Sequence, residues 1–193
     1  MHFSGGFPEV SILWTCEVTG VKCKARIDYL RHDALNDLKT FSNAQRKTID
    51  ACVSSAIAYE IYNIQAVFYD EGLQTIKKML VSDSPNTAEV CSDVDLNNGD
   101  FANFIKSLIN NNQDFTFIFQ ESGQVNNCVA KRFVKKTDGM SNNYWFGTQD
   151  TIYSMMQKYS SFMESNGTTK AWYEHQEVDV LDDSDFTLWM LEG

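Results

Sequence analysis

The stretch that decides the fold is Gly20–Thr40, which reads GVKCKARIDYLRHDALNDLKT. Polar and apolar residues alternate with a period of two through Val21–Leu30 and again through Ala34–Phe41, as in half-buried strands. His32-Asp33 supplies a turn between these two segments. Val10–Val18 alternates in the same way and is joined to the next segment by a second short turn. Three successive strands with tight connections predict an antiparallel meander.

After residue 41 the hydrophobic pattern changes to a helical period. We expect a helix capped by Ser42 or Asn43 that runs to about Tyr59, and a second helix that runs to about Leu80. The polar stretch Ser82–Asn98 predicts a loop. The rest of the chain predicts a helix around Phe101–Ile109, a hairpin of Phe115–Gln120 with Val125–Val134, and a last helix over Thr148–Met163. The predicted class is α+β (mixed α/β), with helices flanking a central mixed sheet that contains the antiparallel meander.

Composition narrows the class of protein further. The 193 residues are 43% hydrophobic, which is enough to build a core, and no apolar run is long enough to span a membrane. We expect no signal peptide, because the first five residues are mostly polar or small. Five cysteines without a C-x-x-C pair fit reduced thiols and a cytoplasmic location, which would be the host cytoplasm for a viral protein.

The net charge of −10 at first disfavours a nucleic-acid partner, but much of the excess negative charge is concentrated in one segment of the chain. The segment 174–193 holds seven acidic residues and no Lys or Arg, and without them 19 acidic residues face 16 basic ones. We therefore divide the chain into one domain over 1–173 and an acidic C-terminal tail over 174–193. The charge balance leaves DNA open as a partner.

Two carboxylates and a lysine fall on adjacent predicted strands. Asp28 shares one strand face with Lys24 and Arg26, and Asp37 shares a face of the next strand with Lys39. Two carboxylates with backbone and phosphate oxygens suit Mg²⁺ or Mn²⁺, and a lysine beside them can orient an attacking water. An ordinary solvated, charged sheet face is the alternative interpretation of the same pattern.

The order of these motifs resembles a known family. Lys24-Ala25-Arg26-Ile27-Asp28 followed by Asn36-Asp37-Leu38-Lys39-Thr40 resembles the active-site hairpin of the PD-(D/E)XK nuclease superfamily, with Ile27 in place of a proline. The branch it is most similar to contains exodeoxyribonuclease VIII, lambda exonuclease and viral recombination nucleases. Gln65-Ala66-Val67-Phe68-Tyr69 matches a third signature, Q-x-x-x-Y, on the second predicted helix.

The resemblance implies a restriction-endonuclease-like core and assigns roles to particular residues. It makes Asp28, Asp37 and the Leu38 carbonyl metal ligands, with Glu9 as an additional acidic ligand, and it makes Lys39 and Gln65 members of the catalytic group. It assigns substrate binding to Lys24, Arg26 and Tyr69. The family usually opens with a histidine-bearing helix, for which His2 is the nearest candidate here.

We therefore expect a Mg²⁺- or Mn²⁺-dependent exonuclease that hydrolyses linear DNA in phage-type recombination or DNA processing. By resemblance, the expected partners are DNA, further copies of the chain in a homo-oligomer that can form a ring, and a single-strand annealing protein; no membrane is expected. Two alternatives stay open. One is a weakly active or inactive accessory or DNA-binding subunit derived from a nuclease, and the other is an endonuclease on the same fold.

Overall fold

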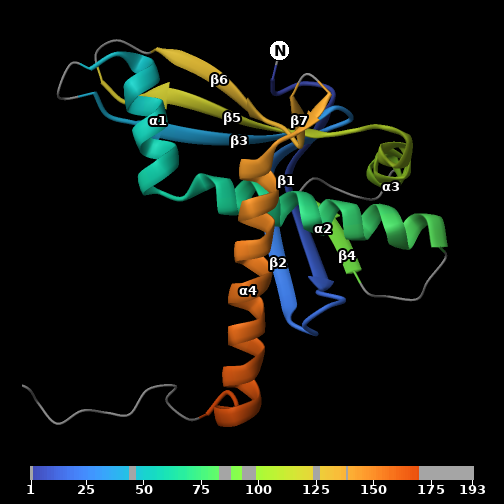
Figure 1. The fold of residues 1–193 in the computed structure, drawn as a ribbon. Helices are drawn as coiled ribbons and strands as arrows, with labels where there is room; N and C mark the ends of the chain where they lie inside the picture. The colour runs from blue at the N-terminus through green and yellow to red at the C-terminus, as the bar shows by residue number, and fades with distance from the viewer. Residues whose placement is uncertain are drawn as a thin grey trace, which may run out of the picture.

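The computed structural model describes residues 2–43, 47–82, 88–92, 99–123, 127–137 and 139–169 (Figure 1). In these residues a six-stranded mixed sheet has the order β4-β1-β2-β3-β5-β6, and four α-helices pack on it. The predicted α+β class is thus confirmed. The strands are β1 Gly6–Thr15, β2 Lys22–Arg31, β3 Ala34–Phe41, β4 Ala88–Ser92, β5 Asp114–Glu121 and β6 Cys128–Phe133, with a small ribbon of β7 Lys136–Thr137 and β8 Met140–Ser141. The helices are α1 Ile49–Tyr59, α2 Tyr62–Ser82, α3 Asp100–Ser107 with a 3₁₀ turn Leu108–Asn110, and α4 Asn143–Asn166.

The sheet divides between β2 and β3. β1 and β2 pair antiparallel almost from end to end, but the ladder between β2 and β3 contains only Tyr29 opposite Asn36 and Leu30 opposite Leu35. β3 then pairs in parallel with β5 along its whole length. Figure 1 shows the result: β1, β2 and β4 lie along one axis, and β3, β5 and β6 lie along another. The carboxylates predicted from the sequence lie where these two groups of strands separate.

The predicted meander is confirmed, but the predicted loop over Ser82–Asn98 is wrong in part. Ala88–Ser92 forms β4, an edge strand that pairs antiparallel with β1. Its five residues are too short for a periodic pattern to stand out from the polar surroundings. Ala88 and Ser92 are buried, and the Ser92 hydroxyl donates to the Pro8 carbonyl at 2.9 Å, so tertiary contacts hold the strand in place.

The first helix begins later than the capping pattern predicts. Thr48 is its N-cap and accepts from the Ala51 N–H, whereas Asn43 is used differently. The Asn43 amide donates to the Lys47 carbonyl and its oxygen accepts from the Lys47 N–H, both at 2.8 Å. These bonds join Asn43 to Lys47 ahead of the helix, because an Asn side chain readily pairs with nearby backbone.

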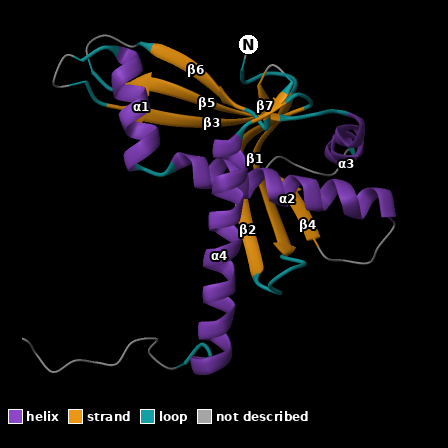
Figure 2. Ribbon diagram, viewed as in Figure 1, coloured by secondary structure: helices purple, strands orange, loops and turns teal. Residues whose placement is uncertain are grey.

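Helix α2 organises the core. It lies across the sheet and packs on β1, β2 and β4, and α4 crosses it (Figure 2). Its buried residues include Ala66, Val67 and Leu73, which join the apolar sides of the strands in one cluster. A row of phenylalanines from β5, Phe115, Phe117 and Phe119, fills the space beneath the start of the helix. No helix in the described part of the chain combines the length and apolar character needed to cross a membrane.

Two glycines in helices offer a matched test of this packing. A Cβ on Gly72 of α2 would lie 2.9 Å from Cζ3 of the buried Trp14, whereas a Cβ on Gly147 of α4 would meet nothing within 4 Å. Gly72→Ala should lower the free energy of unfolding by about 1–3 kcal/mol through overpacking. Gly147→Ala should raise it by about 0.5–1 kcal/mol, because alanine loses less backbone entropy in a helix. Urea unfolding of both variants checks this, and a stabilising Gly72→Ala would contradict the packing of α2 on Trp14.

Candidate active site

Asp37, Lys39 and Gln65 form a closed group of contacts. The Lys39 ammonium donates to Gln65 Oε1 at 2.8 Å, and Gln65 Nε2 donates to Asp37 Oδ1 at 2.7 Å. The Lys39 ammonium also lies 2.7 Å from Asp37 Oδ2. Two residues come from β3 and the third from the first turn of α2, so the helix and the strand fix each other's polar side chains. Asp37 is only 2% exposed.

Asp28 approaches this group from the neighbouring strand. Its Oδ2 accepts a hydrogen bond from the Leu38 N–H at 2.8 Å. Continued by one residue, the β2–β3 register would set Asp28 opposite Asp37, but the backbone ladder has ended and the carboxylate bonds the free N–H instead. Since the N–H and C=O of one strand residue leave the same edge, the Leu38 carbonyl is directed into the same gap.

Burial makes the charge on Asp37 costly. Burial raises the pKa of the Asp37 carboxyl above its ordinary value, and the nearby Asp28 charge raises it further, while Lys39 and Gln65 act in the opposite direction. Asp37 Oδ2 has no hydrogen-bond donor among the described residues, because the Lys39 ammonium approaches it outside hydrogen-bonding geometry. Within the part of the chain that the structure describes, the charge of this oxygen is thus balanced by the Lys39 ammonium alone, and the oxygen keeps a lone pair for a further ligand.

A hard divalent cation fits this set of oxygens. Asp37 Oδ2, the Asp28 carboxylate and the Leu38 carbonyl are the oxygen ligands that Mg²⁺ and Mn²⁺ prefer. No group of three or more His, Cys, Asp or Glu side chains comes together in the ranges that the structure describes. The protein would therefore hold such an ion with two carboxylates and a carbonyl, and water or phosphate oxygens would complete the shell.

Glu9 is engaged elsewhere. Its carboxylate forms an ion pair with Arg26 at 2.6 Å, and both side chains are about half exposed. Pro8 pairs with Tyr29 and Val10 with Ile27, but Glu9 itself is absent from the β1–β2 ladder and has a positive φ of 51°. The structure thus brings Glu9 to Arg26, and it does not gather Glu9 with the two aspartates in one acidic cluster.

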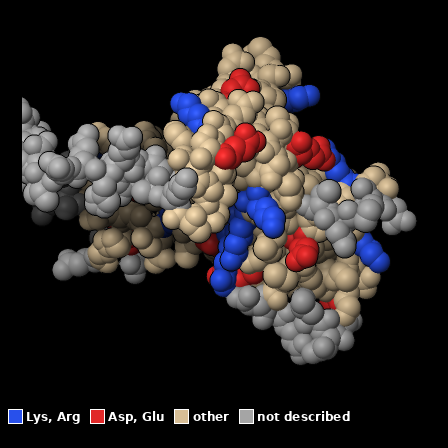
Figure 3. All heavy atoms as spheres, turned by 90° about the horizontal axis from the view of Figure 1, so that it is seen from below, with Lys and Arg blue, Asp and Glu red and all other residues tan. Residues whose placement is uncertain are grey.

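The remaining predicted substrate residues, Lys24 and Tyr69, lie in different parts of the structure. Lys24 is exposed on β2 opposite Leu13, on the same alternation as Lys22 and Arg26. In a view from below, Lys and Arg side chains gather near the middle of the molecule with Asp and Glu around them (Figure 3). Tyr69 packs its ring against Phe115 of β5, with 6.4 Å between centroids, and so contributes to the core.

Tyr62 is a site neighbour that the sequence reasoning missed. The Lys39 ammonium lies 4.6 Å from the centroid of the Tyr62 ring, a cation–π contact. Burial raises the pKa of the Tyr62 hydroxyl, and the charges of Glu60 and Asp37 raise it further. A signal was present in the sequence, because Tyr62 precedes Gln65 by three residues and therefore shares its helix face.

Asp37→Asn tests the cost of the buried charge. The folded carboxyl binds its proton more tightly than the unfolded one, so ionisation destabilises the fold above the folded-state pKa, and this effect disappears as the pH falls towards the ordinary value of 3.8. In metal-free buffer at pH 7, Asp37→Asn should raise the midpoint of thermal unfolding by a few °C, at about 2–4 °C per kcal/mol for a chain of this size. The gain should shrink as the pH is lowered through the acidic range. A lower midpoint at pH 7 would show that the Lys39 pair outweighs desolvation.

A family model matches the part of the chain that carries this site. The model of a family described as a PDDEXK-like domain of unknown function (DUF3799) matches residues 1–82. That range contains β1, β2, β3, α1 and α2, and with them Asp28, Asp37, Lys39 and Gln65. No curated protein matches the chain. Over residues 1–82 the chain is therefore similar to a PDDEXK-like domain.

Proposed function

We propose that the protein is a metal-dependent deoxyribonuclease, and more specifically an exonuclease that degrades linear DNA in phage-type recombination or DNA processing. The observation that carries this proposal is the buried group of Asp37, Lys39 and Gln65, with Asp28 bonded to the backbone between the first two. A structural ion pair alone would not need a second carboxylate turned towards the same point. The similarity to a PDDEXK-like domain supports the same class.

The chain's own residues have distinct parts in phosphodiester hydrolysis. A bound Mg²⁺ would supply positive charge to the scissile phosphate. Lys39 holds a proton-bearing ammonium beside Asp37, where it can bind a phosphate oxygen and orient the attacking water. Gln65 accepts from that ammonium and donates to Asp37, so it keeps Lys39 aimed at one point and limits its rotamers. The Asp28 carboxylate, held by the Leu38 N–H, adds a second negative charge to the site.

Basic side chains on β2 give a path for the DNA backbone. Lys22, Lys24 and Arg26 are exposed at alternate positions of the strand that also carries Asp28. This row can bind phosphates in spite of a net charge of −10, because binding depends on the local field. A homo-oligomeric ring with these residues facing its lumen, and a single-strand annealing protein as a further partner, extend the proposal.

A nuclease-derived accessory subunit is the second candidate, and one contact favours it. Arg26 neutralises Glu9 at 2.6 Å, so the acidic residue expected to add a third carboxylate is held away. With two carboxylates the metal site is weak, and a weak site can serve DNA binding without efficient cleavage.

Lys39→Ala separates the two candidates. On end-labelled linear duplex with Mg²⁺ or Mn²⁺, the wild type should release labelled products, and Lys39→Ala should lower the rate by about 10²–10⁴-fold. The loss should lie in kcat rather than KM, because the ammonium acts chiefly on the transition state. Lys39→Arg should not restore activity, since a planar guanidinium cannot replace a compact ammonium.

Lys106→Ala is the matched control, because Lys106 is an exposed lysine in the last turn of α3. It should leave the rate unchanged. Covalently closed circular DNA should resist the wild type if the enzyme needs an end, and cleavage of the circle would identify an endonuclease. Equal rates for wild type and Lys39→Ala would remove Lys39 from the mechanism, and no cleavage by either protein would favour the accessory subunit.

Metal binding gives an independent prediction. Mn²⁺ should bind weakly to the wild type without DNA, and Asp28→Asn should abolish most of the binding heat in calorimetry. Asp33→Asn should bind like the wild type, because Asp33 is an exposed aspartate that pairs with Arg31 in the β2–β3 turn. Identical titrations of wild type and Asp28→Asn would place the metal elsewhere.

A further inference from the structure

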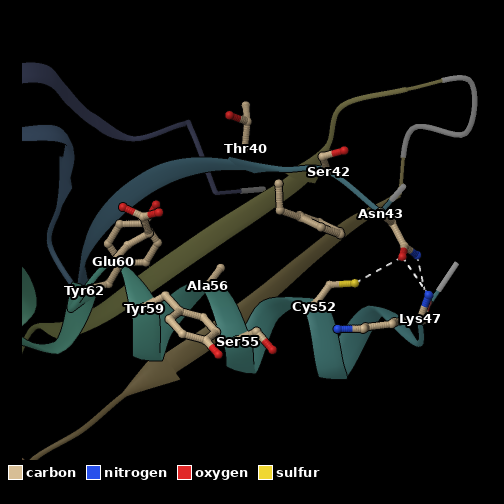
Figure 4. A pocket seen from close by; sticks show the side chains of 11 residues that line it. Thr40, Ser42, Asn43, Lys47, Cys52, Ser55, Ala56, Tyr59, Glu60 and Tyr62 are labelled. Atoms are coloured by element: carbon tan, nitrogen blue, oxygen red, sulfur yellow. Dashed lines mark hydrogen bonds between the residues drawn. The ribbon is translucent and has the colours of Figure 1, made fainter. Parts of the chain in front are cut away.

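A pocket of about 470 Å³ opens between the end of β3 and helix α1 (Figure 4). One wall follows residues 40–43 of the chain, directly after Lys39. The other wall is a single face of α1 and the residue that follows it. This face carries Cys52, Ser55, Ala56 and Tyr59, at the spacing of i, i+3, i+4 and i+7.

The pocket and the candidate active site share a side chain. Tyr62 lines the pocket, and its ring also lies 4.6 Å from the Lys39 ammonium. Thr40 lines the pocket as well and is the neighbour of Lys39 in β3. A ligand that fills the pocket therefore reaches the same ring that the Lys39 ammonium contacts.

The lining chemistry suits a nucleobase better than a phosphate. Tyr59 is 85% exposed and offers a flat ring, and the lining also includes the hydroxyl side chains of Thr40, Ser42 and Ser55. One cation, Lys47, is balanced by one anion, Glu60. Every base has a π-face that can stack on an aromatic side chain, and a carboxylate accepts from exocyclic amino groups such as that of cytosine. The volume lies in the usual range of small-molecule sites, about 300–1,000 Å³.

We propose that this pocket receives one unpaired nucleobase of the strand whose phosphate lies at Lys39, with Tyr59 as the stacking platform and Glu60 as the polar contact. The proposal rests on the proposed nuclease function and specifies its substrate. A base that is paired and stacked inside a duplex cannot turn into the pocket without the cost of unstacking, a few kcal/mol. The substrate is therefore a single strand or the frayed end of a duplex.

Binding in metal-free buffer tests the proposal without any cleavage. The probe is a fluorescein-labelled oligothymidylate of about eight nucleotides, within the range of single-strand sites. Tyr59→Ala should weaken its binding roughly 5- to 150-fold, the effect of losing one base–aromatic stack. Tyr59→Phe keeps the ring and should bind like the wild type. A short duplex closed at both ends by non-nucleotide linkers, so that every base is paired, should bind both variants equally, because it contacts only the phosphate path.

Glu60→Gln adds a test of base chemistry. It should weaken oligodeoxycytidylate more than oligothymidylate, because only cytosine offers an amino group to the carboxylate. The alkylation rate of the Cys52 thiol, measured with and without the oligonucleotide, supplies a second test of binding in the pocket. This thiol lies in the pocket and donates to Asn43 Oδ1 at 3.3 Å, whereas the exposed thiols Cys91 and Cys128 can be replaced by serine. In that background, oligothymidylate should slow alkylation of Cys52, and the duplex closed by non-nucleotide linkers should not.

The outcomes distinguish this inference from the nuclease proposal. The pocket assignment would be overturned if wild type and Tyr59→Ala bound the single strand equally. It would also be overturned if oligothymidylate did not slow the alkylation of Cys52. Both results would hold against the pocket even if Lys39-dependent cleavage occurs. Tyr59-dependent binding with protection of Cys52, in a protein that cuts no DNA, would support the pocket and refute the nuclease.

Discussion

The arrangement of the candidate site depends on one buried carboxylate, Asp37, between β3 and α2. Gln65 and Lys39 are held in place only because the helix and the strand both contribute to the group. The apolar residues that press α2 onto the sheet, such as Ala66 and Val67, follow Gln65 directly and so also place its amide. The same packing that stabilises the core thus fixes the polar group, and the polar group in turn carries an electrostatic cost that the core must offset.

Periodicity predicted much of this arrangement, for a physical reason. Alternation of side chains along a strand fixes which residues share a face, so the pairing of Asp37 with Lys39 follows from two-residue spacing alone. The adjacency of Asp28 follows from the short turn between the strands. Of the two residues of the Q-x-x-x-Y match, Gln65 contacts Lys39 and Asp37, whereas Tyr69 packs against Phe115, and the ring that reaches Lys39 is Tyr62. Several polar residues share one face of a helix, and the position of the helix on the sheet decides which of them contacts a strand. The local sequence pattern does not predict that position.

The features that the sequence could not reveal are departures from regular backbone. Glu9 and Ile61 both have positive φ, at 51° and 54°, and neither is a glycine. Such a conformation costs roughly 1–3 kcal/mol and persists only where the surroundings enforce it. Glu9 lies in the first strand at the position that the ladder skips, which turns its carboxylate to Arg26. Ile61 joins α1 to α2 and so sets the angle between Tyr59 and Tyr62, the two tyrosines that line the pocket.

The parallel ladder between β3 and β5 bears on how the protein is made. The segment 1–82 contains every side chain of the candidate site. The strand beside Asp37, however, begins only at Asp114 and places Phe117 next to it. A chain still growing on the ribosome therefore carries Asp28, Asp37 and Lys39 long before β3 has its parallel partner. Parallel pairing across so long a connection closes late, because the loop entropy must be overcome before the contact stabilises. Until then the nascent chain holds all the chemical groups of the site, while the sheet around Asp37 is incomplete.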